Sequence, residues 1–267
     1  MARPAPLRVR HQKVQRLRRL VARRSVRLAE GAFVLEGETL LGEALDAGVA
    51  LEAVFVAPLG SALAEVERAA AAGVRVYDLA PGVLEQVAGT VTPQPVLAIA
   101  RSNDVALDEI AGATLVVVCV DVRDPGNAGS VLRSAEAAGA GAVVFCRGSV
   151  DVFNPKTVRS SAGSLFHVPV VSGGDPVEVL QRLGEWGFGR VATVSRGGTA
   201  YDEVDLGGRV AVIVGNEANG LPPSLDGYVD VHATIPMAGR AESLNVGVAA
   251  ALMCFEALRQ RRQVGLR

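Results

Sequence analysis

The sequence predicts an α/β protein. From about residue 32 onwards, apolar strand-like segments alternate with helical segments, and this order of elements is typical of layered α/β folds. No uncharged apolar run is long enough to span a bilayer, and the basic N-terminus lacks the apolar core of a secretory signal. At 267 residues the chain can bury a sizeable core and form one large or two ordinary domains. We therefore expect a cytoplasmic protein.

Four strand-like segments occupy the first half of the chain. They are FVLEG, LEAVFVAP, VRVYDL and PVLAIAR, and helical segments separate them. Gly73 ends one of these helices and Pro81 opens the next. The polar, strand-free segment 102–113 follows, so we place a domain boundary there, giving domains 31–108 and 109–267.

The second half repeats the alternation with longer apolar strands. They are LVVVCVDV, AVVFCR, HVPVV, RVATVSR, RVAVIVGN and VDVHATIPM. Such nearly continuous apolar strands are typical of a parallel sheet covered on both faces. Helices are predicted from about Ser130, over 154–162, after Asp175-Pro176, which form an N-cap and first-turn pair, and over 243–262.

Basic residues are concentrated in residues 1–30, which we treat as a separate arm. This arm contains ten of the 27 Lys and Arg residues, Arg3 among them, and one of the 28 acids, so the remainder is acidic. Val14, Leu17 and Val21 have helical spacing, which indicates that the arm is partly helical. A cationic segment on an anionic body is typical of proteins that bind nucleic acid, although a solvated tail remains an alternative.

Several classes of site are disfavoured. The Walker-type sequence G-x-x-x-x-G-K-S/T is missing, and DPGNAGSVLR after the apolar run LVVVCV does not match the dinucleotide fingerprint. The three cysteines are far apart in sequence and read as buried hydrophobes, and no histidine has a partner at metal-ligand spacing. We therefore expect no metal, and a nucleotide-dependent kinase or oxidoreductase is disfavoured.

Polar residues follow three of the predicted strands, where ligands bind in open α/β sheets. The first group is Asn127 with Arg133, which looks buried; the second is Gly215-Asn216-Glu217, closed by Gly220. The third is Ser243-Leu244-Asn245, in which Ser243 is expected to cap the final helix. Each group could be a turn or a cap taken alone, but three at one sheet edge favour a functional site.

Together these groups resemble the three signature motifs of the SpoU-type RNA 2′-O-ribose methyltransferases of the SPOUT superfamily. The matching residues are Asn127-x-Gly129 with Arg133, Gly215-x-Glu217-x-x-Gly220, and Ile235-Pro-Met with Ser243-Leu244-Asn245. The stretch NPKTVRSSAGSLFHVPV is also similar to the segment between the first two motifs. The resemblance covers residues 113–262, and residues 10–100 look like the substrate-binding domain that often precedes such domains.

The resemblance implies a trefoil-knotted, parallel-sheet methyltransferase domain, preceded by a smaller α/β RNA-binding domain, and a homodimer formed through the C-terminal domain. It implies that S-adenosylmethionine is held near the 193–196 strand end by Gly215, Asn216, Glu217, Ile235, Met237, Ser243 and Leu244. It makes Asn127, Arg133, Glu217, Ser243 and Asn245 the catalytic set. Because guanidinium stays protonated, Arg133 is better suited to binding phosphate and stabilising a developing alkoxide than to acting as a base.

The expected activity is transfer of a methyl group to a ribose 2′-hydroxyl of structured RNA. The long N-terminal domain favours large-subunit ribosomal RNA over transfer RNA, because minimal relatives that act on transfer RNA usually lack such a domain. Two alternatives remain: a transfer RNA ribose methyltransferase, and a non-catalytic RNA-binding protein of the same fold.

Overall fold

The computed structural model describes residues 5–60, 63–89, 92–263 and 265. Arg3, counted in the predicted arm, lies outside the described residues. The chain forms two compact units: unit 1 comprises residues 1–103 and 153–166, and unit 2 comprises residues 104–152 and 167–267. Residues 153–166, placed by sequence in the second domain, thus fold with the first.

Unit 1 is built on a four-stranded mixed sheet. Its strand order is β1-β4-β2-β3, with β4 antiparallel to both neighbours and β2 parallel to β3. The strands are β1 (Ala32–Glu36), β2 (Leu51–Val56), β3 (Arg75–Asp78) and β4 (Val96–Arg101). The helices are α1 (Gln12–Ala22), α2 (Arg24–Glu30), α3 (Glu38–Asp46), α4 (Ala64–Ala71) and α5 (Val83–Val87).

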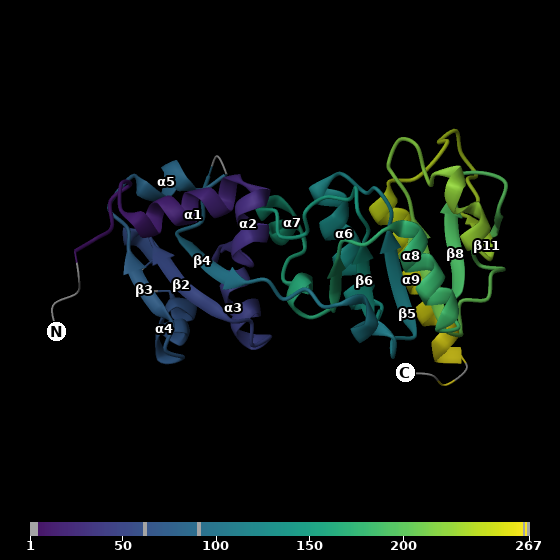
Figure 1. Ribbon diagram of the computed structural model, residues 1–267, viewed down its shortest axis with the longest axis horizontal. Helices are drawn as coiled ribbons and strands as arrows, with labels where there is room; N and C mark the ends of the chain where they lie inside the picture. Colours follow the sequence, from purple (N-terminus) through teal and green to yellow (C-terminus); the bar gives the residue numbers. More distant parts are fainter. Residues whose placement is uncertain (1–4, 61–62, 90–91, 264, 266–267) are drawn as a thin grey trace. The chain divides into compact units, whose positions relative to one another are not determined.

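The basic N-terminal segment is part of this unit from α1 onwards and is not a detached arm (Figure 1). Val14, Leu17 and Leu20 of α1 are fully buried in one core with residues of β1, β2 and β4. The buried Arg27 of α2 donates from Nη1 to the carbonyls of Leu20 at 2.7 Å and Val21 at 3.1 Å. The helix predicted in this segment is confirmed, but the separation of the segment from the body is not, because the apolar stripe of α1 packs on the sheet while Arg18 and Arg19 are exposed.

Residues 153–166 complete the core of unit 1. Helix α7 (Pro155–Ser160) contacts β1, and the rings of Phe33 and Phe153 lie 4.8 Å apart. Phe166 lies 6.3 Å from the same Phe33 ring. Aromatic pairs at these distances add to the burial of the rings themselves.

Unit 2 is built on a seven-stranded, all-parallel sheet, as the apolar strands predicted. Its order is β7-β6-β5-β10-β8-β11-β9. The strands are β5 (Leu115–Cys119), β6 (Ala142–Phe145), β7 (Val170–Ser172), β8 (Gly189–Val194), β9 (Thr199–Ala200), β10 (Val210–Val214) and β11 (Val231–Thr234). The short β9, which pairs with β11, was not predicted.

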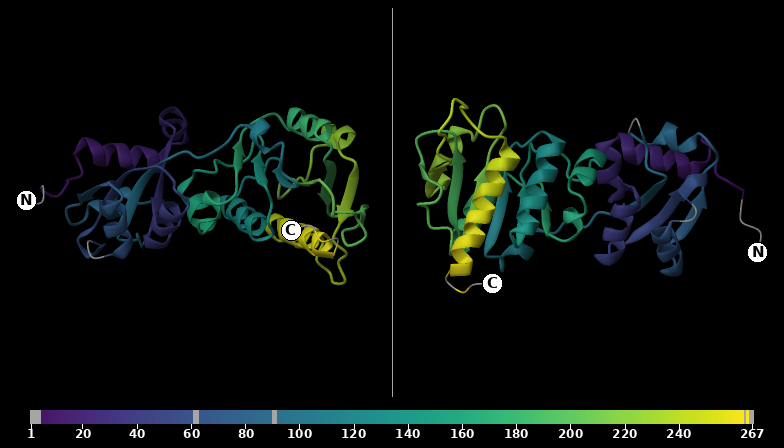
Figure 2. Two further views of the ribbon diagram at one scale, coloured as in Figure 1. Left: turned by 90° about the horizontal axis from the view of Figure 1, so that it is seen from below. Right: turned by 180° about the vertical axis from the view of Figure 1, so that it is seen from behind.

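Helices cover both faces of this sheet. Helix α8 (Pro176–Glu185) packs on one face through Val179, Leu180 and Leu183. Helices α6 (Pro125–Ala137) and α9 (Val246–Gln263) pack side by side on the other face (Figure 2).

The three cysteines are buried free thiols, as predicted. Burial raises the pKa of Cys146 and of Cys254 to about 12, which keeps both thiols protonated and unreactive at neutral pH.

No helix among the described residues is long and apolar enough to cross a membrane. The trefoil knot implied by the resemblance stays a prediction.

Candidate active site

A cavity of about 640 Å³ opens at the carboxyl ends of the central strands of unit 2. Because β5, β10, β8 and β11 are neighbours and parallel, the loops that follow them leave the sheet at one edge. The last residues of β5 and β10, Cys119 and Val214, are register partners, so the first two polar groups begin side by side. The cavity is lined by Asn127, Thr193 to Ser195, Gly215 to Leu221, Ala233, Ile235, Met237, Ser243 to Val246 and Ala249.

The loop after β10 is a tight turn that requires its glycines. Asn216 and Gly220 exchange backbone hydrogen bonds of 3.0 and 2.9 Å. A Cβ on Gly215 would lie 2.5 Å from the carbonyl carbon of Gly220, and Gly220 has φ of +66°. Both positions therefore favour glycine, and the main chain itself forms this wall of the cavity.

The side chain of Asn216 holds this turn in place. Its Oδ1 accepts from the amides of Ala218 and Asn219 at 3.0 and 3.1 Å. Its Nδ2 donates to the Asp121 carbonyl at 2.9 Å and to the Asp121 carboxylate at 3.2 Å. Asp121 has φ of +56°, a conformation that aspartate tolerates better than most residues. The loop after β10 is thus fastened to the loop after β5.

Helix α6 begins earlier than the sequence pattern predicted. Asp124 is its N-cap, and the Asp124 carboxylate accepts from the Asn127 amide at 2.9 Å, with Pro125 in the first turn. Asn127 therefore lies in the first turn of α6. The sequence had predicted a loop at Asn127, followed by a helix from about Ser130. Asp124-Pro125 is an N-cap and first-turn pair of the same kind as Asp175-Pro176, which correctly predicted the start of α8.

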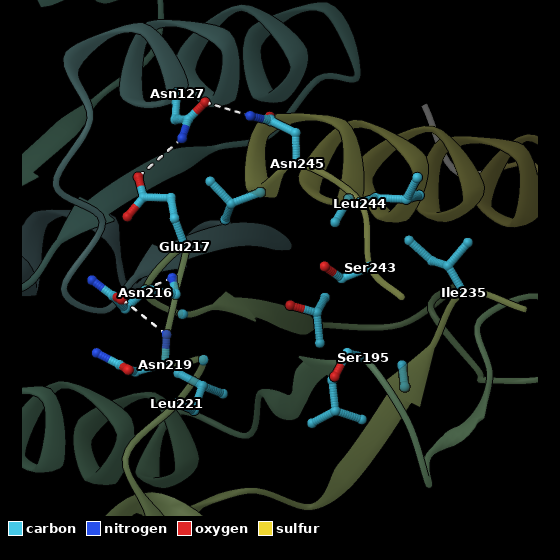
Figure 3. A pocket seen from close by; sticks show the side chains of 18 of the residues that line it. Asn127, Ser195, Asn216, Glu217, Asn219, Leu221, Ile235, Ser243, Leu244 and Asn245 are labelled. Atoms are coloured by element: carbon cyan, nitrogen blue, oxygen red, sulfur yellow. Dashed lines mark hydrogen bonds between the residues drawn. The ribbon is translucent and has the colours of Figure 1, made fainter. Parts of the chain in front are cut away.

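Asn127, Glu217 and Asn245, one from each polar group, form a continuous hydrogen-bond chain (Figure 3). Asn127 Nδ2 donates to Glu217 Oε1 at 3.0 Å, and Asn245 Nδ2 donates to Asn127 Oδ1 at 2.8 Å. The three predicted groups therefore converge, with side chains 90 to 118 residues apart in sequence in direct contact.

Glu217 accepts two further hydrogen bonds at the start of α6. The amides of Asp124 and Arg123 donate to its Oε1 and Oε2 at 3.1 and 3.2 Å. Burial raises the pKa of Glu217, but the hydrogen bonds from Asn127 and from the backbone amides outweigh this effect and lower it overall. Glu217 is therefore an ionised acceptor at neutral pH, held where the helix dipole also favours negative charge.

The third group precedes α9. The helix begins at Val246, and Asn245, not Ser243 as predicted, caps it: Asn245 Oδ1 accepts from the Gly247 and Val248 amides at 2.9 and 3.4 Å. A Cβ on Gly247 would lie 2.9 Å from Ser130 Cβ, so the start of α9 approaches α6 closely. Ser243 is free of this capping role and lies on the cavity wall (Figure 3).

The cavity is chemically suited to S-adenosylmethionine. Its volume lies within the range of about 300 to 1,000 Å³ that is usual for small-molecule sites. Leu221, Ile235 and Leu244 give the wall apolar surface that would suit an adenine ring, while the glycine turn brings main-chain donors and acceptors to the wall. All the residues predicted to bind the cofactor line this single cavity. Among the described residues, no His, Cys, Asp and Glu cluster could hold a metal ion.

Arg133 differs from the prediction. It was expected to be buried, but it is exposed on α6, and the described residues that line the cavity do not include it. Six residues correspond to about 1.7 helical turns, so Arg133 points roughly 120° away from Asn127 around the helix. Asp121 and Asp124, which fix the loop geometry, had no assigned role in the prediction.

The sequence and its relatives establish the family. Residues 114–255 match the SpoU rRNA Methylase family, and residues 11–98 match the MRM3-like substrate binding domain. The chain therefore belongs to the SpoU rRNA methylase family, whose members are S-adenosylmethionine-dependent RNA 2′-O-methyltransferases. The family resemblance inferred from the three motifs is confirmed, including the substrate-binding domain in front.

Two relatives are named for methylation of 23S rRNA. The chain is 35% identical over 245 residues to the Bacillus subtilis 23S rRNA (guanosine(2553)-2'-O)-methyltransferase RlmP, covering 92% of this chain and 95% of that protein. It is 35% identical over 209 residues to the Xylella fastidiosa 23S rRNA (guanosine-2'-O-)-methyltransferase RlmB, covering 74% and 83%.

Solved structures agree with the fold. The SpoU methyltransferase AviRb from Streptomyces viridochromogenes, in complex with AdoMet, has a TM-score of 0.84 at 29% identity, covering 95% of this chain and 100% of that chain. The AdoMet-bound rRNA methyltransferase from Sinorhizobium meliloti has a TM-score of 0.82 at 30% identity, covering 95% and 97%.

Proposed function

We propose that this protein transfers a methyl group from S-adenosylmethionine to a ribose 2′-hydroxyl of large-subunit ribosomal RNA. The observation that carries the proposal is the hydrogen-bond chain from Asn245 through Asn127 to Glu217, at the rim of a cavity suited to the cofactor. Ribosomal RNA is favoured because a relative that shares nearly the whole chain is named for 23S rRNA.

The bound cofactor would supply an electrophilic sulfonium methyl group, and the protein's own side chains would position the acceptor ribose. In-line placement of two reactants can contribute on the order of 7–11 kcal/mol to lowering a barrier. Asn127 and Asn245 tie the start of α6 to the start of α9, which fixes one side of the reaction space. Ser243 adds a hydroxyl on the cavity wall.

Glu217 serves as a positioning residue in this proposal and not as the base. A general base works best with a pKa near the working pH, whereas the hydrogen bonds to Glu217 lower its pKa. Its carboxylate instead orients the Asn127 amide and fixes the backbone at residues 123 and 124.

Arg133 is proposed to bind an RNA phosphate outside the cofactor cavity and to stabilise the developing alkoxide. Its exposed position on α6 leaves the guanidinium accessible to RNA. A planar guanidinium makes strong charge-assisted hydrogen bonds to phosphate oxygens.

The proposal includes a homodimer formed through unit 2. Val248 and Phe255 of α9 are each 48% exposed, although both are large and apolar. They lie seven residues apart, so they share one face of the helix. Burying this face against a second copy would remove it from water. We also propose that the enzyme is cytoplasmic.

The test is transfer of labelled methyl groups to separated ribosomal RNA and transfer RNA from cells that lack this protein. Label in 23S rRNA is the expected outcome. Label confined to transfer RNA would favour the first alternative, and cofactor binding with no transfer to either RNA would favour a non-catalytic RNA-binding protein.

A further inference from the structure

A second cavity, of about 600 Å³, lies in unit 1, whereas the cofactor cavity lies in unit 2. It is formed between the N-terminal segment, the start of α1 and the end of β3. Its walls are Ala5, Pro6, Leu7, Arg8, His11, Lys13, Tyr77 and Asp78. The proposed methyl transfer uses none of these residues.

The N-terminal segment is firmly held at this cavity. Leu7 pairs with Leu79 as an extra parallel bridge just beyond β3, an edge strand of the sheet. The Leu7 amide donates to the Asp78 carbonyl at 2.7 Å, and the Ala80 amide donates to the Leu7 carbonyl at 2.9 Å. The wall formed by residues 5–8 is therefore part of the folded unit.

Two cationic residues, Arg8 and Lys13, line the cavity. Lys13 Nζ lies 4.9 Å from the centre of the Tyr77 ring, and Arg75 is on the same face of β3 as Tyr77. Burial raises the pKa of Tyr77, but hydrogen bonds with Lys13 and Arg75 outweigh it and lower the pKa. Among the described residues, no carboxylate forms a salt bridge with Arg8 or Lys13. These charges are available to an anion.

The remaining walls have a different character. Pro6, Leu7 and the Tyr77 ring give apolar surface, and His11 Nδ1 accepts from the Lys13 amide at 3.2 Å, which leaves Nε2 as a donor. Asp78 is the acid among the lining residues, and strand alternation directs it to the face of β3 opposite Tyr77.

We propose that this cavity binds one unpaired nucleotide of the RNA substrate, with its phosphate at Arg8 and Lys13 and its base against Pro6, Leu7 and the edge of Tyr77. RNA-binding proteins commonly recognise splayed, unpaired nucleotides with this combination of cations and apolar or aromatic surface. The proposal rests on the proposed function for the identity of the RNA, but the binding itself is measurable without methyl transfer.

The test uses full-length protein and a fluorescein-labelled, ten-nucleotide single-stranded RNA of mixed sequence. Arg8→Ala/Lys13→Ala should weaken binding at least tenfold and lower the slope of log affinity against log salt by about 0.7, because the two side chains share one phosphate and each neutralised phosphate of a single strand contributes roughly 0.7. The matched control is Arg23→Ala/Arg24→Ala, which removes the same charge from exposed positions of unit 1. Equal losses in both double variants would overturn the cavity as a specific site.

Two further measurements test the base and the location. An abasic RNA of equal length should bind wild type more weakly than the normal RNA, and this ratio should shrink in the Arg8/Lys13 variant; an unchanged ratio would contradict a base contact. Crosslinking with 4-thiouridine RNA should label tryptic peptide 76–101, which contains Tyr77. Adducts at Pro6 or Leu7 would also agree with the cavity, whereas adducts confined to peptides without a lining residue would place the nucleotide elsewhere.

Methyl transfer separates this inference from the proposed function. If the RNA is the methyl acceptor, the Arg8/Lys13 variant should raise KM for RNA while kcat stays within twofold of wild type. A loss of kcat with KM unchanged would contradict a binding role for the cavity. Failure of wild type to methylate any RNA would refute the proposed function while the binding measurements still decide the cavity.

Discussion

Asn127 Nδ2 donates to Glu217 Oε1 at 3.0 Å, although 90 residues separate the two in sequence. The other end of the same carboxamide accepts from Asn245, so both polar atoms of the Asn127 side chain are engaged and its orientation is fixed. One asparagine thus joins the loops that follow β5 and β10 to the start of α9. Substitutions at this junction and around it should therefore have separable effects on catalysis, cofactor binding and stability.

Asn127→Ala should lower methyl transfer about 100-fold or more, because it frees the start of α6 from both neighbouring loops. Cofactor affinity should change by less than about fivefold, because Asn127 is only one of many cavity residues. Initial rates and isothermal titration measure the two quantities. Ser130→Ala, on the same helix, is the control; a similar loss in both variants would mean that α6 was disturbed in general.

Gly215→Ala should weaken S-adenosylmethionine binding at least tenfold. The new Cβ would lie 2.5 Å from the Gly220 carbonyl carbon, so the turn must open. Gly208→Ala is the matched control, because a Cβ there would meet no atom within 4 Å and the φ of Gly208 is not in the left-handed region. Calorimetric titration measures both variants, and unchanged affinity in Gly215→Ala would remove this turn from the cofactor site.

Arg133→Ala should abolish measurable methyl transfer and leave cofactor affinity unchanged, because the exposed guanidinium lies outside the cavity lining. Arg133→Lys should restore only part of the rate, since lysine cannot bind phosphate in a bidentate manner. Arg147→Ala, an exposed arginine of the same unit, should behave as wild type. Normal turnover in Arg133→Ala would exclude a catalytic role.

Val248→Glu/Phe255→Glu should convert a dimer into a monomer, because charged groups would then face the proposed contact between α9 helices. Light scattering at micromolar concentration measures the mass. Leu28→Glu is the control, since Leu28 is also a large exposed apolar residue, 62% exposed, but belongs to unit 1. A wild-type protein that is monomeric under these conditions would refute the dimer.

Glu217 should make stability depend on pH. Its folded-state pKa is lowered, so its stabilising contribution is fully present above the ordinary glutamate pKa of about 4.3 and is lost as pH falls through the folded-state value. The difference in unfolding free energy between wild type and Glu217→Gln should therefore be constant near neutral pH and shrink below about pH 4.3. Urea unfolding between pH 7 and 3 measures it, and a difference that grows on acidification would contradict this role of Glu217.

The sequence predicted the parallel sheet and the convergence of three polar groups, because apolar strands and strand-end loops leave local signals. The start of α6 was missed although Asp124-Pro125 encodes it, since the glycines and Asn127 suggested a loop. In the N-terminal segment the spacing of Val14, Leu17 and Val21 correctly predicted a helix, but the ten basic residues hid its packing on the sheet.

Some features had no local signal at all. The engagement of Asn127 with Glu217 and Asn245 depends on contacts across 90 and 118 residues, and the addition of residues 153–166 to unit 1 depends on Phe33. Arg133 is exposed because Ala128, Val131, Leu132 and Ala135 form the buried face of α6, and this face does not depend on where the helix begins.

Alkaline hydrolysis of RNA labelled from S-adenosylmethionine tests the central claim most directly. A 2′-O-methyl group blocks cleavage of the adjoining phosphodiester, so we predict label in alkali-resistant dinucleotides of 23S rRNA with wild type and at least about 100-fold less with Asn127→Ala. Label released entirely as mononucleotides would contradict ribose methylation and assign the methyl group to a base.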